Sequence, residues 1–210
     1  FYGCSSLNGN LHLGFGLKRV GSYAFYQCSK LTGSLRLGYR KFESYTYSID
    51  YSYYTDYYSC RICDYAFYGC SDFEGDLSLF NVSYIGKFAF SRCGFTGNLD
   101  VQISIIDDYA FAHCTGFKGY LRFDDRNYIQ SYAYKIGKYA FYNCAGFNGS
   151  LQIPYRYILI DDYAFCGCSG FNGELDFDYS YDYYSYNSQI KSIGKYAFCN
   201  CSGLKDDLKL

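Results

Sequence analysis

The stretch Ile136-Gly137-Lys138-Tyr139-Ala140-Phe141-Tyr142-Asn143-Cys144 recurs along this chain with small variations. Its central string, Ala-Phe-x-x-Cys, appears seven times, and Phe1-Tyr2-Gly3-Cys4 is a truncated copy at the start. Successive cysteines of this string are 21 to 42 residues apart, so the basic unit has 21 to 24 residues and three units carry insertions. A period of this length is typical of a solenoid, whose stacked units bury a continuous core.

Each unit is expected to contain a short helix, a glycine turn and a strand. One apolar set has the spacing i, i+1, i+4 and i+7 of a two-turn helix face; in one unit it is Ala140, Phe141, Cys144 and Phe147. Leu151 and Ile153 follow with the period of two of a strand that buries one face. The sequence therefore predicts an α/β repeat: a single solenoid domain over residues 1–210, with about eight units.

Stacking brings like positions of successive units into columns about 4.8 Å apart. One column is expected to hold left-handed backbone or a helix cap: Gly21, Cys63, Gly86, Asp107, Gly137, Asp161 and Gly194. The next column alternates in charge, so that neighbouring units form opposite-charge pairs: Asp64, Lys87, Asp108, Lys138, Asp162 and Lys195. A third column stands directly before Ala-Phe: Tyr23, Tyr65, Tyr109, Tyr139, Tyr163 and Tyr196.

Eight of the 12 cysteines form a column of their own: Cys4, Cys28, Cys70, Cys93, Cys114, Cys144, Cys168 and Cys201. Parallel side chains about 4.8 Å apart keep their Cβ atoms beyond the usual disulfide range of about 3.5 to 4.5 Å. We therefore expect buried thiols that pack as small hydrophobic groups.

The four other cysteines have different expected roles. Cys166 and Cys199 occupy the same position in successive units, and a disulfide between them is the preferred pairing. Cys60 and Cys63 form a single Cys-x-x-Cys, with no second pair to complete a zinc site, so a local disulfide or two free thiols are expected. No cofactor or metal is predicted.

The unit resembles the BspA-like leucine-rich repeat, whose signature is a strand, a link to Ile-Gly, and then Ala-Phe-x-x-Cys-x-x-Leu. The resemblance covers nearly the whole chain and implies a leucine-rich-repeat-type solenoid. Members of that family are largely surface or secreted proteins of bacteria and protists that serve in adhesion or binding, so the resemblance implies no enzymatic activity. Two features depart from the family pattern: Ile-Pro follows the strand once, at Ile153-Pro154, and Tyr-rich insertions are added.

The insertions all fall between the strand of one unit and the Ile-Gly of the next, at residues 39–61, 124–135 and 178–192. A constant place in the unit puts them on one face of the solenoid. Tyrosines alternate there with polar residues, as in an extended strand that shows an aromatic row to a partner, although a disordered polar loop is the alternative. The candidate interface residues are Tyr45, Tyr47, Tyr51, Tyr53, Tyr54, Tyr57, Tyr58, Tyr179, Tyr181, Tyr183, Tyr184 and Tyr186.

Composition excludes several classes of function. With 19 basic and 20 acidic residues and no basic tract, the chain has no electrostatic footprint for nucleic acid or anionic membrane, and its apolar runs are too short to span a bilayer. The carboxylate pairs Asp107-Asp108 and Asp161-Asp162 already have structural roles in the columns, and neither His12 nor His113 belongs to a nucleophile constellation. We therefore expect no enzyme. Three glycosylation sequons begin at Asn81, Asn148 and Asn200, of which Asn81 is the first candidate and Asn200 the last.

Both ends of the sequence follow the internal repeat pattern instead of the polar pattern of capping units. Open complementary ends favour head-to-tail stacking of copies into a filament, unless the chain is a fragment without its caps. The leading hypothesis is an extracellular structural protein that polymerises with itself. The alternative is a cell-surface adhesion or ligand-binding module that holds a host protein or glycan on the face of the Tyr-rich insertions.

Overall fold

The structure is a computed structural model, and it describes residues 1–14, 16–37, 60–80, 82–102, 105–123, 134–154, 159–177 and 190–209. Three groups of sequence-based predictions lie outside these residues: the Tyr-rich stretches, all twelve candidate interface tyrosines, and Asn81. The last residues of the three insertions lie in strands of the described part of the chain. Cys60 and Arg61 belong to β5, Lys135 to β11, and Ser192 to β15.

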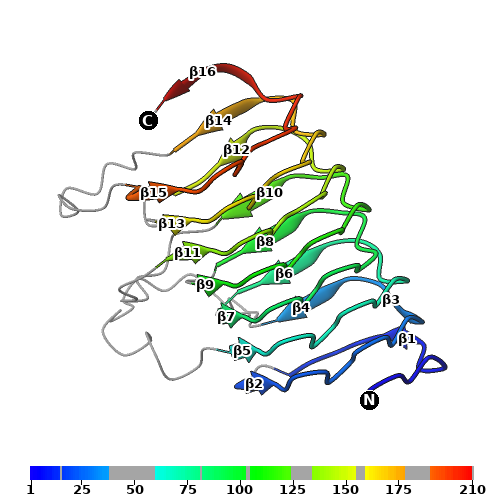
Figure 1. Cartoon of the computed structure of the whole chain (residues 1–210). Helices are drawn as coiled ribbons and strands as arrows, with labels where there is room; N and C mark the ends of the chain where they lie inside the picture. The colour runs from blue at the N-terminus through cyan, green and yellow to red at the C-terminus, as the bar shows by residue number, and fades with distance from the viewer. Residues whose placement is uncertain are drawn as a thin grey trace, which may run out of the picture.

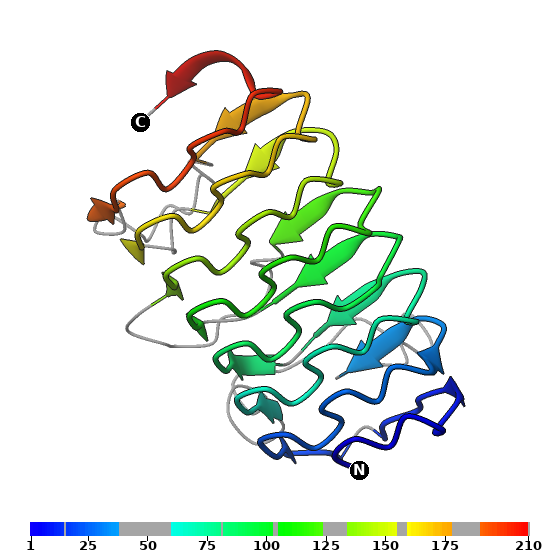
Figure 2. The ribbon, with the colours of Figure 1, turned by 45° about the vertical axis from the view of Figure 1, so that its right-hand side comes forward.

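Short parallel strands make up the regular structure of the described residues, and Figures 1 and 2 show them stacked as successive rungs. Their bounds are β1 Gly9–Asn10, β2 Arg19–Val20, β3 Leu31–Thr32, β4 Leu35–Leu37, β5 Cys60–Ile62, β6 Leu77–Leu79, β7 Val82–Ile85, β8 Leu99–Val101, β9 Ile105–Ile106, β10 Leu121–Phe123, β11 Lys135–Ile136, β12 Leu151–Gln152, β13 Leu159–Ile160, β14 Glu174–Asp176, β15 Ser192–Ile193 and β16 Lys205–Lys209.

The strands form two lines along the solenoid (Figure 1). One line is a seven-stranded sheet in the order β15-β13-β11-β9-β7-β5-β2. The other line contains a two-stranded sheet (β1-β3), a four-stranded sheet (β10-β8-β6-β4) and a three-stranded sheet (β12-β14-β16). Most pairs join equivalent residues of successive units, as Lys135 pairs with Leu159 and Ile136 with Ile160. In the first unit Gly9 pairs with Leu31 instead of its counterpart Gly33, and register shifts interrupt the pairing of β5 with β7 and of β14 with β16. Apart from these places, the repeat in the sequence sets the register.

The core between the two lines consists of stacked side chains. Ile62, Ile85, Ile106 and Ile136 are fully buried on one side, and the leucines of the second line lie opposite. The phenylalanine of Ala-Phe forms a continuous stack with ring centroids 5.0 to 5.4 Å apart along Phe1, Phe25, Phe67, Phe90, Phe111, Phe141, Phe165 and Phe198. Such pairs contribute about 0.5 to 1.5 kcal/mol each beyond the burial of their area.

The helix predicted for each unit is wrong: the described residues contain no helix, and Ala-Phe-x-x-Cys forms a chain of turns. In the unit of Tyr139, the amides of Ala140, Tyr142 and Cys144 donate to carbonyls three residues back at 3.1 to 3.2 Å. Tyr139 and Asn143 both have φ of 57°, in the left-handed region that the third residue of a type II turn requires. A left-handed residue at these two points prevents a right-handed helix.

The remaining amides of the turn segment bond to the next unit. Tyr139 N donates to Asp162 O at 3.1 Å, Phe141 N to Ala164 O at 2.7 Å, and Asn143 N to Cys166 O at 2.9 Å. Alternate residues therefore satisfy their amides within the turn and between units, whereas a helix would satisfy them all internally. The units are tied together along the turns as well as along the strands.

The Gly and Asp column does not hold left-handed backbone, and that prediction is also wrong. The left-handed residue is the tyrosine two positions later, as at Tyr65 with φ of 57° and Tyr139. At Gly137, glycine is needed for a different reason, because a Cβ there would lie 2.7 Å from the carbonyl carbon of Asp107. Asp107 has a side chain that caps the following amide, since its Oδ1 accepts from Asp108 N at 2.8 Å.

Candidate interaction surface

The tyrosine column forms an aromatic stack along the turns. Its ring centroids are 4.6 to 5.1 Å apart, and Phe88 fills the place of the missing tyrosine: the sequence is Tyr23, Tyr65, Phe88, Tyr109, Tyr139, Tyr163 and Tyr196. The rings stack face to face, so their faces contact one another. Tyr23 is 43% exposed and Tyr196 63%, at the two ends of this stack.

A second aromatic column, which the sequence analysis missed, lies at the first x of Ala-Phe-x-x-Cys. Tyr2 stacks on Tyr26 at 4.9 Å, and Tyr26 stacks on Tyr68 at 5.1 Å. Aligning the units at this position would have revealed it. The same position holds Cys166 and Cys199 near the other end of the chain.

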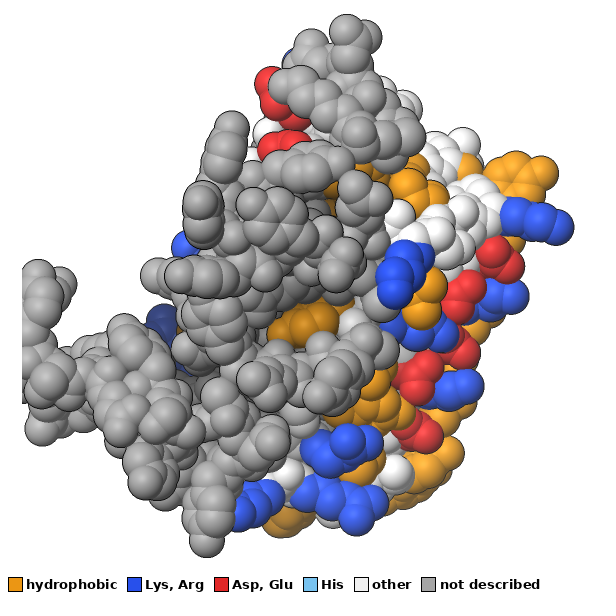
Figure 3. All heavy atoms as spheres, turned by 90° about the vertical axis from the view of Figure 1, so that its left-hand side faces the viewer, with side chains coloured by type: hydrophobic (Ala, Val, Ile, Leu, Met, Phe, Trp, Pro, Cys, Tyr) orange, Lys and Arg blue, Asp and Glu red, His pale blue; other side chains and the backbone are white. Residues whose placement is uncertain are grey.

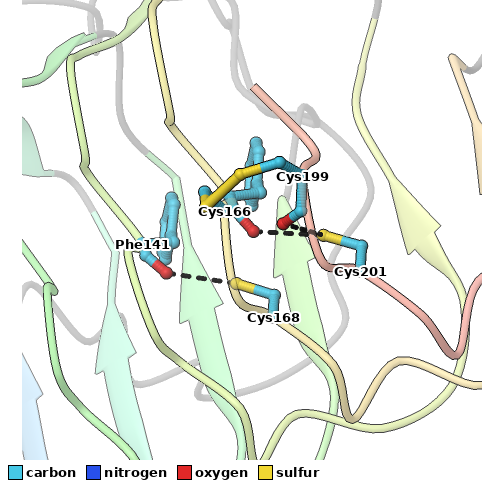
Figure 4. Close-up of a disulfide and its surroundings, with 6 residues drawn as sticks. Phe141, Cys166, Cys168, Cys199 and Cys201 are labelled. Carbon is cyan, nitrogen blue, oxygen red and sulfur yellow. Dashed lines mark hydrogen bonds between the residues drawn. A yellow bond between two sulfur atoms is a disulfide. The ribbon is translucent and has the colours of Figure 1, made fainter. Parts of the chain in front are cut away.

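Cys166 and Cys199 form a disulfide, with their Cα atoms 4.5 Å apart (Figure 4). The bridge joins the turns of two successive units across a sequence separation of 33 residues. The segment between them contains the third Tyr-rich insertion, so the disulfide fixes the two rungs that flank it.

The cysteine column consists of free thiols, of which those from Cys28 to Cys168 are buried, Cys201 is partly buried and Cys4 is exposed. From Cys28 onward, each Sγ donates to the carbonyl oxygen of the phenylalanine one unit earlier, at 2.9 to 3.1 Å. Figure 4 shows one such bond, from Cys168 to Phe141. The thiols therefore act as weak donors that tie the units together, which packing alone would not require.

Burial makes four thiols of this column unreactive. It raises the pKa of Cys114 to about 12 and that of Cys201 to about 11, and it raises the pKa of Cys144 and Cys168 well above the usual range. The thiolate is the nucleophile and metal ligand, so these four thiols are unsuited to either role at neutral pH.

Cys60 and Cys63 are two free thiols and not a local disulfide. Cys60 is buried, which raises the pKa of its thiol to about 11, and Cys63 Sγ accepts from Arg19 Nε at 3.1 Å. Among the described residues, no group of three or more His, Cys, Asp or Glu side chains is arranged to hold a metal ion.

The carboxylate pairs have structural partners. Asp107 Oδ2 accepts from Tyr84 OH at 2.9 Å, and burial together with this hydrogen bond raises the pKa of Tyr84. Asp161 forms an ion pair with Lys135 at 3.1 Å. Their neighbours Asp108 and Asp162 belong to the charged column.

The two histidines lie apart in the fold. His12 is exposed beside β1. His113 has φ of 62° in the turn, where its ring meets Tyr142 edge-on at 5.4 Å. Burial, with a contribution from Arg92, lowers the pKa of His113. The position of His113 in its unit therefore serves the backbone turn.

The charged column joins each rung to both of its neighbours. The ammonium group of Lys87 lies 3.2 Å from Asp108 Oδ2, and that of Lys138 lies 3.1 Å from Asp162 Oδ2. The aspartates also accept backbone amides: Asp64 from Lys87 at 3.0 Å, Asp108 from Lys138 at 3.0 Å, and Asp162 from Lys195 at 2.9 Å. The bond from Lys195 and the contact with Lys138 lower the pKa of Asp162.

Two of the three sequon asparagines are described. Asn148 is exposed, and its amide nitrogen Nδ2 donates to the carbonyl oxygen of Lys118. Asn200 is also exposed and has φ of 56°. Glycan attachment at Asn148 would give up the bond to Lys118, and at either site it stays a prediction.

Comparison with known families identifies the repeat. The model of the BspA type leucine-rich repeat region, six copies, matches residues 1–56, 57–135 and 127–207. The chain belongs to this family. No curated protein and no solved structure matches the chain.

Membership in the BspA-type family fits the parallel rungs and the exposed columns described above. Proteins with these repeats are typically surface-associated, and the repeat is generally a non-enzymatic scaffold for protein interactions. Within the part of the chain that the structure describes, no helix has the length and apolar character needed to cross a membrane.

Proposed function

We propose that this BspA-type repeat protein is an extracellular structural protein whose copies stack head to tail into filaments. The observation that carries the proposal is the contact between units. Among the described residues, each unit from the first to the seventh donates amide hydrogens of its turn to the carbonyls of the following unit, as Phe141 N does to Ala164 O at 2.7 Å. Its other side accepts the same bonds, so the two stacking surfaces of a unit are complementary.

Stacking of complementary surfaces does not close on itself. A contact between two different surfaces of the same unit repeats along an axis and places no limit on the number of rungs. The phenylalanine stack would extend across a junction between copies, because its outer members are not fully covered: Phe1 is 70% exposed and Phe198 is only partly buried.

The test is electron microscopy and sedimentation of the 210-residue chain over a range of concentrations. We expect rods longer than one solenoid, which lengthen with concentration. Tyr196→Asp should shorten them, because it places a charge on the stacking surface. Tyr120→Asp is the matched control: Tyr120 is 40% exposed but lies outside the turn stacks, with Arg122 over its ring at 5.4 Å. Monodisperse single rods at high concentration would overturn the proposal.

Adhesion is the second proposal, supported by the surface association that is typical of the family. In this case the Tyr-rich insertions hold a host protein or glycan, since tyrosine is enriched in interfaces. Replacing residues 39–59 by a short Gly-Ser linker, which leaves β5 intact, should abolish binding to the partner cell while the wild-type chain still binds. Equal binding by both chains would argue against it.

A further inference from the structure

The charged column alternates in sign, and its side chains stay partly exposed although they form ion pairs within one molecule. Its six rungs read minus, plus, minus, plus, minus, plus: Asp64, Lys87, Asp108, Lys138, Asp162 and Lys195. Acidic and basic side chains gather along one edge of the solenoid in Figure 3. The side chains of Lys87 and Lys138 remain 51% and 47% exposed in their ion pairs. An ammonium group has three donors, so further acceptors can be bound.

The order of these charges is self-complementary when the column is reversed. Six alternating charges that begin with minus and end with plus read plus, minus, plus, minus, plus, minus from the other end. A second copy laid alongside in the opposite direction would therefore face every charge with its opposite. Asp108 would face Lys138 of the second copy, and Lys138 would face Asp108.

We propose that this edge is a docking surface for a second copy of the same chain, in an antiparallel pair with a two-fold axis between the rungs of Asp108 and Lys138. Such an interface uses the same patch on both copies and closes as a dimer. The column runs along the side of the solenoid, so the pairing does not depend on head-to-tail stacking.

Even rung spacing would keep the charged columns of the two copies in register along their length. The tyrosine column stands one residue beyond the charges, and its rings stack at 4.6 to 5.1 Å from Tyr23 to Tyr196. Two copies of one column therefore have the same rung spacing. The exposed ring edges and hydroxyl groups of the tyrosines would flank the charges and add contact area.

Additional charges beside the column fit the same arrangement. Asp107 and Asp161 precede Asp108 and Asp162, and their rungs would face the rungs of Lys138 and Lys87 in the second copy. A parallel copy shifted by one rung would match five charges and leave one unmatched at each end. The antiparallel arrangement matches all six, and it is therefore the one we favour.

The test is sedimentation of the 210-residue chain and of two charge variants. Lys138→Glu makes the two central rungs acidic, and Asp108→Lys makes them basic. Each variant alone should dimerise at least about tenfold more weakly than wild type, because like charges then face each other at the centre. An equimolar mixture should restore dimers of one variant with the other, because acidic rungs then face basic ones.

The control variant is Lys30→Glu, which makes the same charge change outside the column. Lys30 pairs with Asp72 at 2.8 Å and is 60% exposed, so its loss should leave dimerisation unchanged. Wild-type dimerisation should weaken between about 0.05 M and 0.5 M salt, as screening shortens the range of the charges.

Three results would overturn the proposal: a wild-type chain without a dimer at low salt, a mixture of the variants that does not recover, or an open-ended series of oligomers that the charge variants do not change. Circular dichroism of each variant confirms that it has folded. Lys138→Glu changes the side of the solenoid and not its ends, so filaments that persist in this variant are compatible with head-to-tail stacking. The two proposals can therefore fail separately.

Discussion

Replacing Tyr139 by alanine and by glycine should reveal the turn that stands where a helix was predicted. In a helix interior, glycine is less stable than alanine by about 1 kcal/mol, because it loses more backbone freedom on folding. At φ of 57°, the order should reverse. Left-handed backbone is unfavourable by about 1 to 2 kcal/mol for a residue with a Cβ and not for glycine.

The structure gives the size of both effects. Each variant removes two ring stacks, with Tyr109 and with Tyr163, both at 4.8 Å. At about 0.5 to 1.5 kcal/mol a stack, both variants should lose about 1 to 3 kcal/mol from the rings. Tyr139→Gly also relieves the backbone strain, which offsets part of this loss. It should therefore be more stable than Tyr139→Ala by about 1 kcal/mol.

The assay is urea unfolding of the 210-residue chain followed by circular dichroism, with the comparison restricted to variants of equal m-value. The control is the same pair of substitutions at Lys138, which is not among the residues with positive φ. There alanine should be at least as stable as glycine. A Tyr139→Ala variant that is more stable than Tyr139→Gly would refute the left-handed turn.

Three further perturbations probe the contacts between units. Gly137→Ala should lower the free energy of unfolding by more than about 2 kcal/mol, because the new Cβ would lie 2.7 Å from the carbonyl carbon of Asp107. The control Gly21→Ala should be nearly neutral, because nothing lies within 4 Å of a Cβ there. Equal losses of free energy for the two variants in urea unfolding would contradict the close approach at Gly137. Cys199→Ser should lose about 3 to 4 kcal/mol, because the disulfide closes 33 residues, and a reductant should destabilise wild type but not the variant. Burial raises the pKa of Cys114 to about 12, from about 8.5 in the unfolded chain. The protonated thiol therefore contributes its full stabilisation of the fold below pH 8.5, and this contribution declines toward pH 12. Cys114→Ala should make the fall of Tm over this range less steep, and an unchanged slope would exclude this thiol as a cause.

The sequence was sufficient for the repeat, the solenoid and the columns, because each depends on residues that recur in register. The sequence was misleading where a helix and a series of turns produce the same apolar pattern. The spacing of Ala140, Phe141 and Cys144 suits a helix face, but it also suits three consecutive turns that point the same side chains inward. The residue before each cysteine was the missed signal: Gly69, Asn143 and their counterparts include residue types that tolerate left-handed backbone.

The turns also explain why surface columns exist in this protein. A helix would satisfy its own amides and could shift against its neighbour, with only side-chain packing to hold the register. Here alternate amides of each turn bond to the next unit, as Tyr139 N does to Asp162 O at 3.1 Å, so a slip of one residue would break these bonds. Charges and rings are thereby held one above another along the whole stack. A continuous line of alternating charge follows from this register, and that line makes the edge complementary to a reversed copy of itself.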